Sequence, residues 1–375
     1  MNELAEKYWP TFKLLLLPYL LLLFLLIWPI DYTIYCPGGL ADVSDTVSID
    51  YDDSNSPAGS FSTTYIMSVK RPSFFQFMVA YFLDVTETYT LSASDKTHTN
   101  AESYQISQLQ KTTSVQVAIV AAYQAINAVK PEITVVEVIK TLVSDKASYL
   151  SYYDQIEYGD EFISMVGDNG LVLPFNAEPG DSECDNDADN DGIIDTACSL
   201  SDAIAINTRL APSYTFTFRH ADGENYTLVL TKNTDTNAFG LSLTMYHLLD
   251  ENGTNPDFVA LPSNIGGPSG GLMTALYIYD SLASGDLTHG MKIAGTGTIN
   301  YDGSVGYIGG VKQKIATAYF FGADIFFIPY LADTSNDNYI EALAACEELG
   351  INPDGWLIGV QTLQDTITYL EGLGE

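Results

Sequence analysis

The chain has 375 residues, of which 46% are hydrophobic, and this length suffices for two or three domains with separate cores. Its 48 acidic residues outnumber its 15 basic residues, which gives a formal net charge of −33 at pH 7. A nucleic acid would require a basic face, so the composition argues against a nucleic-acid partner. The excess of acid is typical of a heavily solvated surface that favours solubility.

Residues 12–30 form an apolar segment, and its sequence from Leu14 to Ile30 is "LLLLPYLLLLFLLIWPI". This segment approaches the roughly 20 residues that a membrane-spanning helix requires. Lys7 and Lys13 precede the uncharged run that begins at Leu14, and acidic residues follow from Asp31 onward. The positive-inside rule therefore places the tail of residues 1–11 in the cytoplasm and the rest outside. The alternative is a cleaved signal peptide, but no small-x-small cleavage site follows the segment. We expect an uncleaved, single-pass anchor in the cell membrane.

The next region, residues 31–129, is predicted to be a mixed α/β region. "FSTTYIMSVKR" (61–71) has the alternation of a strand, and "FFQFMVAYFLDV" (74–85) follows as an apolar helix. "TTSVQVAIVAAYQAINAV" (112–129) carries apolar residues at helical spacing, so we expect a helix with one buried face.

Residues 130–235 begin with β-rich sequence, contain a short helix at "SDAIAINTRL", and end in the hairpin "SYTFTFRHADGENYTLVLT". The region resembles a PDZ domain of the kind found in bacterial proteases. The resemblance is carried by "DAIAI", the hairpin, and Gly159, Asp160, Ile163, Val166 and Gly167. A PDZ domain would bind an extended peptide as an added strand. A small α/β spacer without a ligand is the alternative.

An acidic insertion at residues 181–198 interrupts this region. Alternating carboxylates before a turn glycine suit a hard cation such as calcium, and the candidate ligands are Asp187, Asp189, Asp191 and Asp195. The twelfth position of the loop is Cys198, so the loop is not an EF-hand. An acidic turn closed by a disulfide between Cys184 and Cys198 is an equal alternative. We expect Cys36 and Cys346 to be packed free thiols.

Residues 240–375 alternate strands and helices, which predicts an α/β layer domain. The expected strands are "HGMKIAGTGTI", "ADIFFIPY" and "WLIGV", and the expected helices are "KQKIATAYFFG", "NYIEALAACEELG" and "LQDTITYLEGL". The chain as a whole is therefore expected to combine α/β and α+β domains behind one transmembrane helix.

Ser269 lies in the turn "GGPSGG", directly before an expected buried helix, and is a candidate nucleophile. Such a serine needs a base, and neither His247 nor His289 has a recognisable catalytic context. Lys312 begins a helix, where the macrodipole disfavours a cation, and its neighbours are apolar. Both effects would lower the pKa of the amine, and a neutral amine can accept the proton of Ser269.

Two motifs, "GGPSGG" and "TGTINYDGSVGYIGGVKQKIATA", resemble the proteolytic domain of the Lon family, whose dyad is a serine and a lysine. The resemblance assigns the dyad to Ser269 and Lys312. Thr296 matches a threonine of the family motif, and two roles are open for it: orienting Lys312 or packing within a strand. It leaves Lys314 as a solvated residue. With the anchor and the PDZ-like region, the chain resembles membrane-anchored PDZ–Lon-like proteins of bacteria.

The resemblance implies a serine endopeptidase that cleaves unfolded or flexible protein segments outside the cytoplasm. Backbone N–H groups around Ser269, at Gly267 and Gly270, would hold the oxyanion. Many Lon proteases have an acid at the position of Gly266. No G-x-x-x-x-G-K-[ST] motif is present, so we expect no ATP requirement and no cofactor beyond structural calcium. A ring-shaped homo-oligomer is implied by analogy alone. The alternatives are a peptide-binding module with an inactive Lon-like domain, and a hydrolase of non-peptide esters or amides.

Overall fold

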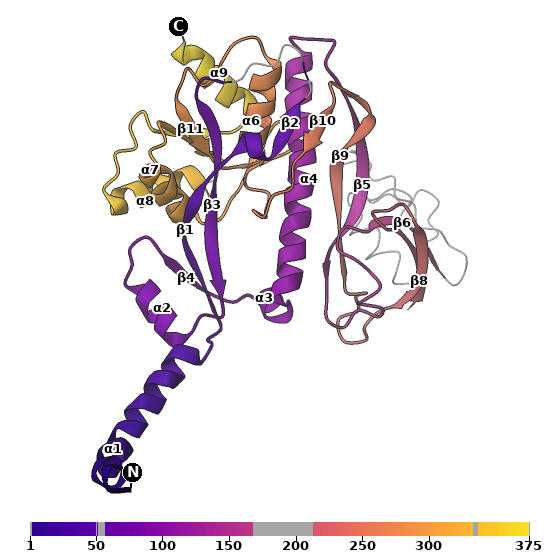
Figure 1. The fold of residues 1–375 in the computed structure, drawn as a ribbon. Coiled ribbons are helices and arrows are strands. Elements are labelled where there is room, and N and C mark those ends of the chain that lie inside the picture. The colour runs from indigo at the N-terminus through magenta and orange to yellow at the C-terminus, as the bar shows by residue number, and fades with distance from the viewer. Residues whose placement is uncertain (1, 50, 52–56, 168–212, 333–336, 375) are drawn as a thin grey trace. The chain divides into compact units, whose positions relative to one another are not determined.

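The computed structural model describes residues 2–49, 51, 57–167, 213–332 and 337–374. The chain divides into two compact units (Figure 1). Unit 1 comprises Met1–His98, Val259–Leu261 and Ser269–Glu375, and unit 2 comprises Thr99–Phe258 and Pro262–Pro268. Unit 2 is thus an insertion in the sequence of unit 1.

Unit 1 is built on a six-stranded mixed sheet with the order β15-β14-β11-β3-β1-β4. The strands β3, β11, β14 and β15 run parallel, and β1 and β4 continue the sheet in antiparallel fashion. The bounds of these strands are β1 Tyr32–Asp42, β3 Ser60–Lys70, β4 Glu87–Thr90, β11 Lys292–Gly295, β14 Ile325–Pro329 and β15 Leu357–Val360. Two short pairs accompany the sheet: β2 (Val47–Ile49) with β10 (Phe258–Ala260), and β12 (Thr298–Ile299) with β13 (Val305–Gly306).

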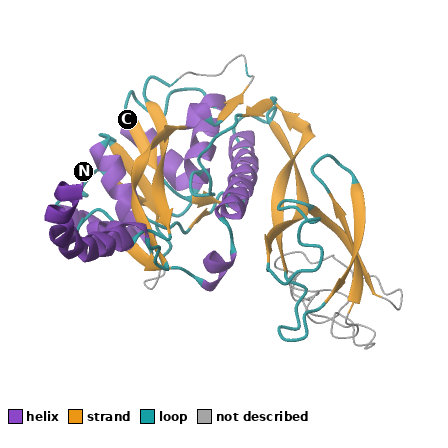
Figure 2. Ribbon diagram, turned by 60° about the horizontal axis from the view of Figure 1, so that its bottom comes forward, coloured by secondary structure: helices purple, strands orange, loops and turns teal. Residues whose placement is uncertain are grey.

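Helices α2 and α6 to α9 of unit 1 contact this sheet (Figure 2). The bounds of all helices of unit 1 are α1 Asn2–Ile27, α2 Phe74–Tyr81, α3 Ala93–Thr97, α6 Gly271–Leu282, α7 Val311–Phe320, α8 Asn338–Leu349 and α9 Leu363–Leu373, with a 3-10 turn η1 at Val43–Asp45. The strand β14 shows how two layers are held. Phe326 and Ile328 pack in the cluster formed with α7 and α8. The ring of Phe327 instead faces Tyr369 of α9, with 5.8 Å between the two ring centroids.

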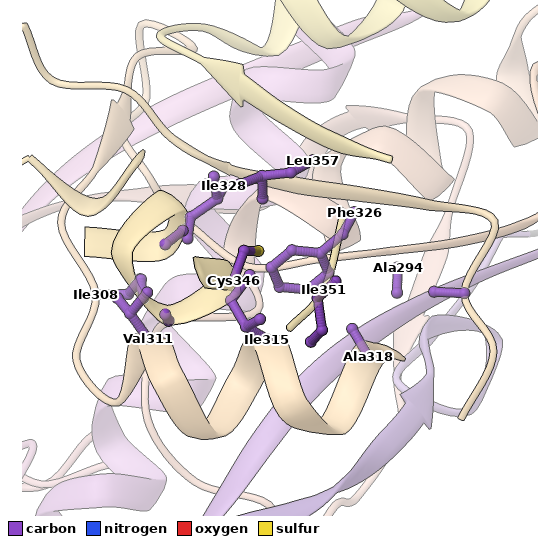
Figure 3. Packing of buried hydrophobic residues seen from close by; sticks show 13 residues of the cluster. Ala294, Ile308, Val311, Ile315, Ala318, Phe326, Ile328, Cys346, Ile351 and Leu357 are labelled. Atoms are coloured by element: carbon purple, nitrogen blue, oxygen red, sulfur yellow. The ribbon is translucent and has the colours of Figure 1, made fainter. Parts of the chain in front are cut away.

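The core under α7 fixes that helix firmly (Figure 3). Val311, Ile315 and Ala318 are buried in one cluster with Cys346 of α8, and recur at the three- and four-residue spacing of a helix face. The N-cap of α7 is Gly310, in the left-handed conformation with φ 68°, which glycine adopts without strain. Cys36 and Cys346 are both free thiols, as expected.

Unit 2 combines the long helix α4 (Asn100–Asn127) with a five-stranded antiparallel sheet of order β8-β7-β6-β5-β9. The strands are β5 Thr134–Lys146, β6 Glu161–Gly167, β7 Ser213–Arg219, β8 Asn225–Thr231 and β9 Leu241–Asn255. An aromatic core that includes Phe162, Tyr214, Phe216, Phe218 and Phe239 packs against the sheet. The predicted helix at 201–210 lies outside the described residues.

The units are divided differently from the predicted domains of 31–129, 130–235 and 240–375. The strands β1 and β3 join the C-terminal strands in one sheet, so the early chain is part of unit 1. The strand β9 pairs with β5 over its length and belongs to unit 2. Hydrogen bonds between strands that are distant in sequence determine that β1 and β3 belong to unit 1 and that β9 belongs to unit 2. Local sequence patterns contain no information about these pairings.

The helix α1 is long and apolar enough to cross a membrane from Lys7 to Ile27, and none of this stretch is buried within the protein.

Candidate active site

Ser269 is half-buried and lies just before the start of α6, with Gly270 as the N-cap. Its carbonyl oxygen accepts two hydrogen bonds, from the backbone N–H of Gly297 at 2.8 Å and from Oγ1 of Thr296 at 3.1 Å. Leu272 in turn donates its N–H to the carbonyl of Gly297 at 3.0 Å. The segment that follows β11 therefore holds the backbone of the serine at the N-terminus of the buried helix α6.

The loop that precedes Ser269 is fixed to α4 within unit 2. Gly267 donates its N–H to the carbonyl of Ser107 at 2.8 Å, and Ser114 donates its hydroxyl to the carbonyl of Pro268 at 3.0 Å. A Cβ atom at Gly266 would lie 1.8 Å from Oγ of Ser107. An acid at this position, as in many Lon proteases, would not fit this packing.

Of the two residues predicted to hold an oxyanion, Gly267 has a backbone N–H that is already hydrogen-bonded. The N–H of Gly267 is already bonded to Ser107, so it is not available to a substrate. Within the described part of the chain, the N–H groups of Ser269 and Gly270 donate to no acceptor. They lie at the N-terminus of α6, where unpaired N–H groups and the helix dipole favour a negative charge.

Lys314 is the lysine that the fold brings to this serine. It lies on α7, is only 3% exposed, and donates from Nζ to Oγ1 of Thr296 at 2.9 Å. Burial lowers the pKa of its amine from 10.5 to about 7, because charge is disfavoured away from water. Among the described residues no carboxylate forms an ion pair with it. Thr296 thus connects the amine to the Ser269 carbonyl through two successive hydrogen bonds.

Lys312, the predicted base, is placed elsewhere. Its amine forms an ion pair with Glu348 of α8, whose side chain is 54% exposed. Lys314 was expected to be solvated, and this expectation is wrong. Of the two lysines, Lys314 is the one whose amine bonds a residue that also bonds Ser269.

Helical periodicity contains the signal that identifies Lys314. Val311, Ile315 and Ala318 form the buried face of α7, and position 314 lies three residues after 311 and four before 318. Residues at these separations share one face of a helix. Position 312 lies on a different face, so its burial should not be inferred from the same apolar neighbours.

A further residue near the serine, Thr63 of β3, was not predicted. Its hydroxyl is buried, has no hydrogen-bond partner among the described residues, and lies 3.1 Å from where a Cβ of Gly270 would be. A buried hydroxyl without a partner is unusual in a folded protein. It places a hydrogen-bond donor beside the first residue of the turn after Ser269.

The two histidines considered as bases are held by other partners. His247 contacts Glu137 across the strands β9 and β5 of unit 2, and Nε2 of His289 contacts the carbonyl of Leu370 at 2.9 Å. The Ser269 hydroxyl forms no hydrogen bond with any described residue. Catalytic hydrogen bonds are often long before substrate binds, so this is compatible with a reactive serine.

The predicted calcium ligands Asp187, Asp189, Asp191 and Asp195, and the predicted disulfide of Cys184 and Cys198, lie outside the described residues. In unit 2, ligand atoms of Glu157, Asp160 and His220 lie within 4.8 Å of one another. His220 contacts Asp160 at 2.8 Å, and this hydrogen bond raises the pKa of the imidazole. Tyr226 also donates to Asp160. The group is therefore explained as an internally bonded polar cluster.

This cluster borders a cavity of about 660 Å³ in unit 2. Tyrosines and carboxylates line much of it, among them Glu102, Tyr104, Tyr153, Asp154 and Tyr158. The amine of Lys146 also lines it and donates to the carbonyl groups of Tyr153 and Ile156.

Neither protein-family models nor curated protein sequences give a match to this chain.

Proposed function

We propose that this chain is a membrane-anchored serine endopeptidase with a Ser269–Lys314 dyad. The observation that carries the proposal is the buried Lys314 amine, with a pKa of about 7, bonded to the hydroxyl that also bonds Ser269. Burying an unpaired lysine costs stability, and strongly perturbed groups of this kind cluster at functional sites. The resemblance of both motifs to Lon proteolytic domains supports the same chemistry.

The reaction follows from the state of the amine. Neutral Lys314 accepts the proton of the Ser269 hydroxyl as its oxygen attacks the peptide carbonyl. The resulting ammonium gives this proton to the leaving amine, and an acyl group stays on the Ser269 oxygen. Lys314 then accepts a proton from water as the water oxygen attacks the ester, and it returns this proton to the Ser269 oxygen as the acid product leaves. Thr296 holds the amine in position throughout.

The oxyanion would form beside the N-terminus of α6. The N–H groups of Ser269 and Gly270 are the donors that we assign to it. Each such donor is worth roughly 3 kcal/mol of transition-state stabilisation in well-studied enzymes.

The proposed location and substrates follow from the remainder of the chain. The apolar helix α1 would anchor the protein, with unit 1 and unit 2 outside the cytoplasm. Because the sequence has no P-loop motif, the chain itself would not use ATP to unfold substrates. Unfolded segments and flexible tails are therefore the substrate class.

The test uses the full chain in detergent micelles, without ATP, and measures cleavage of fluorescently labelled casein. We expect cleavage by the wild type, and its loss in Ser269→Ala and Lys314→Gln. The matched control is Lys312→Gln, two residues away on the same helix, which should retain cleavage. An acylating probe should label Ser269 in the wild type, and mass spectrometry should locate the adduct.

Casein cleavage that survives Lys314→Gln but is lost in Lys312→Gln would identify Lys312 as the base, as the sequence motif predicts. Labelling of Ser269 without casein cleavage would favour hydrolysis of a small ester or amide. A peptide-binding module with an inactive unit 1 is the second candidate, and the cavity of unit 2 favours it. Absence of both labelling and cleavage, with peptide capture retained, would establish that alternative.

A further inference from the structure

The short helix α2 exposes an unusual apolar surface. No charged residue occurs between Arg71 and Asp84. The exposed side chains, which we call the α2 apolar face, are Phe74, Phe75, Val79, Tyr81, Phe82 and Leu83. Phe82 is 72% exposed and Tyr81 is 67% exposed. In a protein with a net charge of −33, such an uncharged patch is not what solubility requires.

The α2 apolar face belongs to a well-formed helix. Ser73 and Gln76 form a reciprocal capping box, with bonds of 3.2 Å to the Gln76 N–H and 2.8 Å to the Ser73 N–H. On the opposite side of the helix, Ala80 is buried and the ring of Phe77 packs on Tyr32 at 4.6 Å. The helix thus already buries one side, and the exposed rings form the other.

The start of α2 is joined to the end of α1. Phe74 donates its N–H to the carbonyl of Trp28 at 3.3 Å, and Ile30 donates to the carbonyl of Pro72 at 2.9 Å. Pro29 and Ser73 form a β-bridge between these bonds. The ring of Trp28 stacks on Phe24 at 4.9 Å, at the end of the apolar stretch of α1. Figure 1 shows α2 beside this end of α1.

The charged residues near α2 suit a membrane surface. Arg71 precedes the helix and donates from Nη2 to the carbonyl of Lys96 at 3.1 Å, and Lys70 pairs with Asp95 at 2.7 Å. Lys96 pairs in turn with Asp31 at 3.3 Å, so three basic residues, two of them in ion pairs, lie where α1 ends. Basic residues beside exposed aromatic and aliphatic side chains are typical of helices that lie in the headgroup region of a bilayer.

We infer that α2 lies in the membrane–water interface, with the α2 apolar face inserted among the lipids of the bilayer that α1 spans. This inference rests on the proposed anchoring by α1. The backbone bonds between Trp28 and Phe74 and between Ile30 and Pro72 require α2 to start at the depth where α1 ends. A bilayer there removes the exposed rings from water and gives unit 1 a second attachment, which limits its rotation about α1.

The experiment uses the full chain in nanodiscs of phosphatidylcholine and phosphatidylglycerol in a 3:1 ratio, about the charge density of an anionic membrane. Single Phe75→p-benzoylphenylalanine and Phe82→p-benzoylphenylalanine variants are irradiated, and lipid adducts are measured by mass spectrometry. Phe24→p-benzoylphenylalanine reports insertion of α1. Phe320→p-benzoylphenylalanine is the matched control, because Phe320 is an aromatic residue of α7 that is 83% exposed.

We expect lipid adducts at positions 24, 75 and 82, and at least tenfold less at position 320. Adducts at position 24 without adducts at 75 and 82 would overturn the interfacial helix and leave the anchor intact. Crosslinks from 75 or 82 to a second copy of the chain would assign the face to a protein contact and overturn the inference. No adduct at position 24 would reject the anchoring itself, and the inference with it. Casein cleavage is measured separately, so failure of the protease proposal remains distinguishable.

Discussion

The amine of Lys314 and the backbone of Ser269 share one hydroxyl, that of Thr296, with distances of 2.9 Å to the amine and 3.1 Å to the carbonyl oxygen. Ser269 lies in the loop before α6, and Lys314 lies in the first turn of α7. The threonine follows β11, in the centre of the sheet of unit 1. The position of the amine relative to the serine is therefore set by the sheet rather than by a flexible loop, as catalytic geometry requires.

Activity should depend on pH through Lys314. The proposed mechanism needs the neutral amine, and the pKa of Lys314 is lowered to about 7 by burial. kcat/KM should therefore rise as pH increases through about 7 and level off above pH 8. The measurement is cleavage of a peptide without histidine between pH 5 and 9. Lys312→Gln should keep the same midpoint, and a profile that is flat across this range would contradict the assignment.

Removal of the bridging hydroxyl should impair catalysis more than folding. Thr296→Val keeps the shape of the side chain but leaves Lys314 without its partner. We expect kcat to fall about tenfold to hundredfold because the amine loses its fixed position. Thr296→Ser retains the hydroxyl and should recover most of the activity. Equal activity of the valine and wild-type proteins would show that Thr296 only packs the strand.

Lys314 should be costly to the stability of the fold. Its pKa falls from 10.5 to about 7 on folding, so the unfolded chain binds more protons between these pH values. Stability should therefore rise with pH across this window, and the full cost applies below pH 7. At about 1.4 kcal/mol for each pKa unit, this cost is about 5 kcal/mol.

Lys314→Met should accordingly raise the free energy of unfolding at pH 6.5 by several kcal/mol, and the gain should disappear near pH 10.5. Denaturant unfolding of the full chain in micelles measures both values. Lys312→Met removes only a pair with a half-exposed partner, and should change stability by less than about 1 kcal/mol. A Lys314→Met protein that is less stable at pH 6.5 would contradict the burial cost.

A second buried ionisable group, Asp280 in the last turns of α6, should also make the stability of the fold depend on pH. Asp280 is fully buried, accepts from the Leu287 N–H at 2.7 Å, and its second carboxylate oxygen has no partner among the described residues. Burial raises its pKa from 3.8 to about 6. Its stabilising contribution is therefore complete below pH 3.8 and is lost as pH rises through about 6.

Asp280→Asn keeps the acceptor for Leu287 and removes the ionisation. Relative to wild type, the variant should gain up to about 3 kcal/mol between pH 4 and pH 8. Thermal unfolding at both pH values measures this difference. The opposite trend, a variant that loses stability relative to wild type as pH rises, would indicate that the carboxylate has a cationic partner.

Local patterns predicted the C-terminal helices and strands of unit 1, but neither the strands β1 and β4 nor the assembly of the sheet. The apolar spacing of α7 and the glycine that ends α8 at Gly350 both appear as expected. The pairing of β3 with β11, and of β5 with β9, joins segments separated by more than 90 residues, and no local periodicity reports it. For the same reason, the domain boundaries could not be placed from sequence.

The candidate site was predicted in part. Ser269 could be found because glycine and proline mark its turn before an apolar helix. The prediction of Lys312 rests on its place at the start of the helix and in the motif, whereas burial on a helix depends on the angular position of the residue. The role of Thr63 could not be predicted, because it comes from a strand about 200 residues before the serine and is adjacent only in the folded sheet.

The order of strands in unit 1 has a consequence for biosynthesis. The strand β3 needs β11 as its parallel neighbour, and Gly59 donates its N–H to the side chain of Thr288, 229 residues later. A ribosome therefore releases α1, the first half of the sheet and all of unit 2 before it makes α7. Under the proposed function, a nascent chain would carry no assembled Ser269–Lys314 dyad, and would have no proteolytic activity toward itself or its neighbours, until α7 has been synthesised.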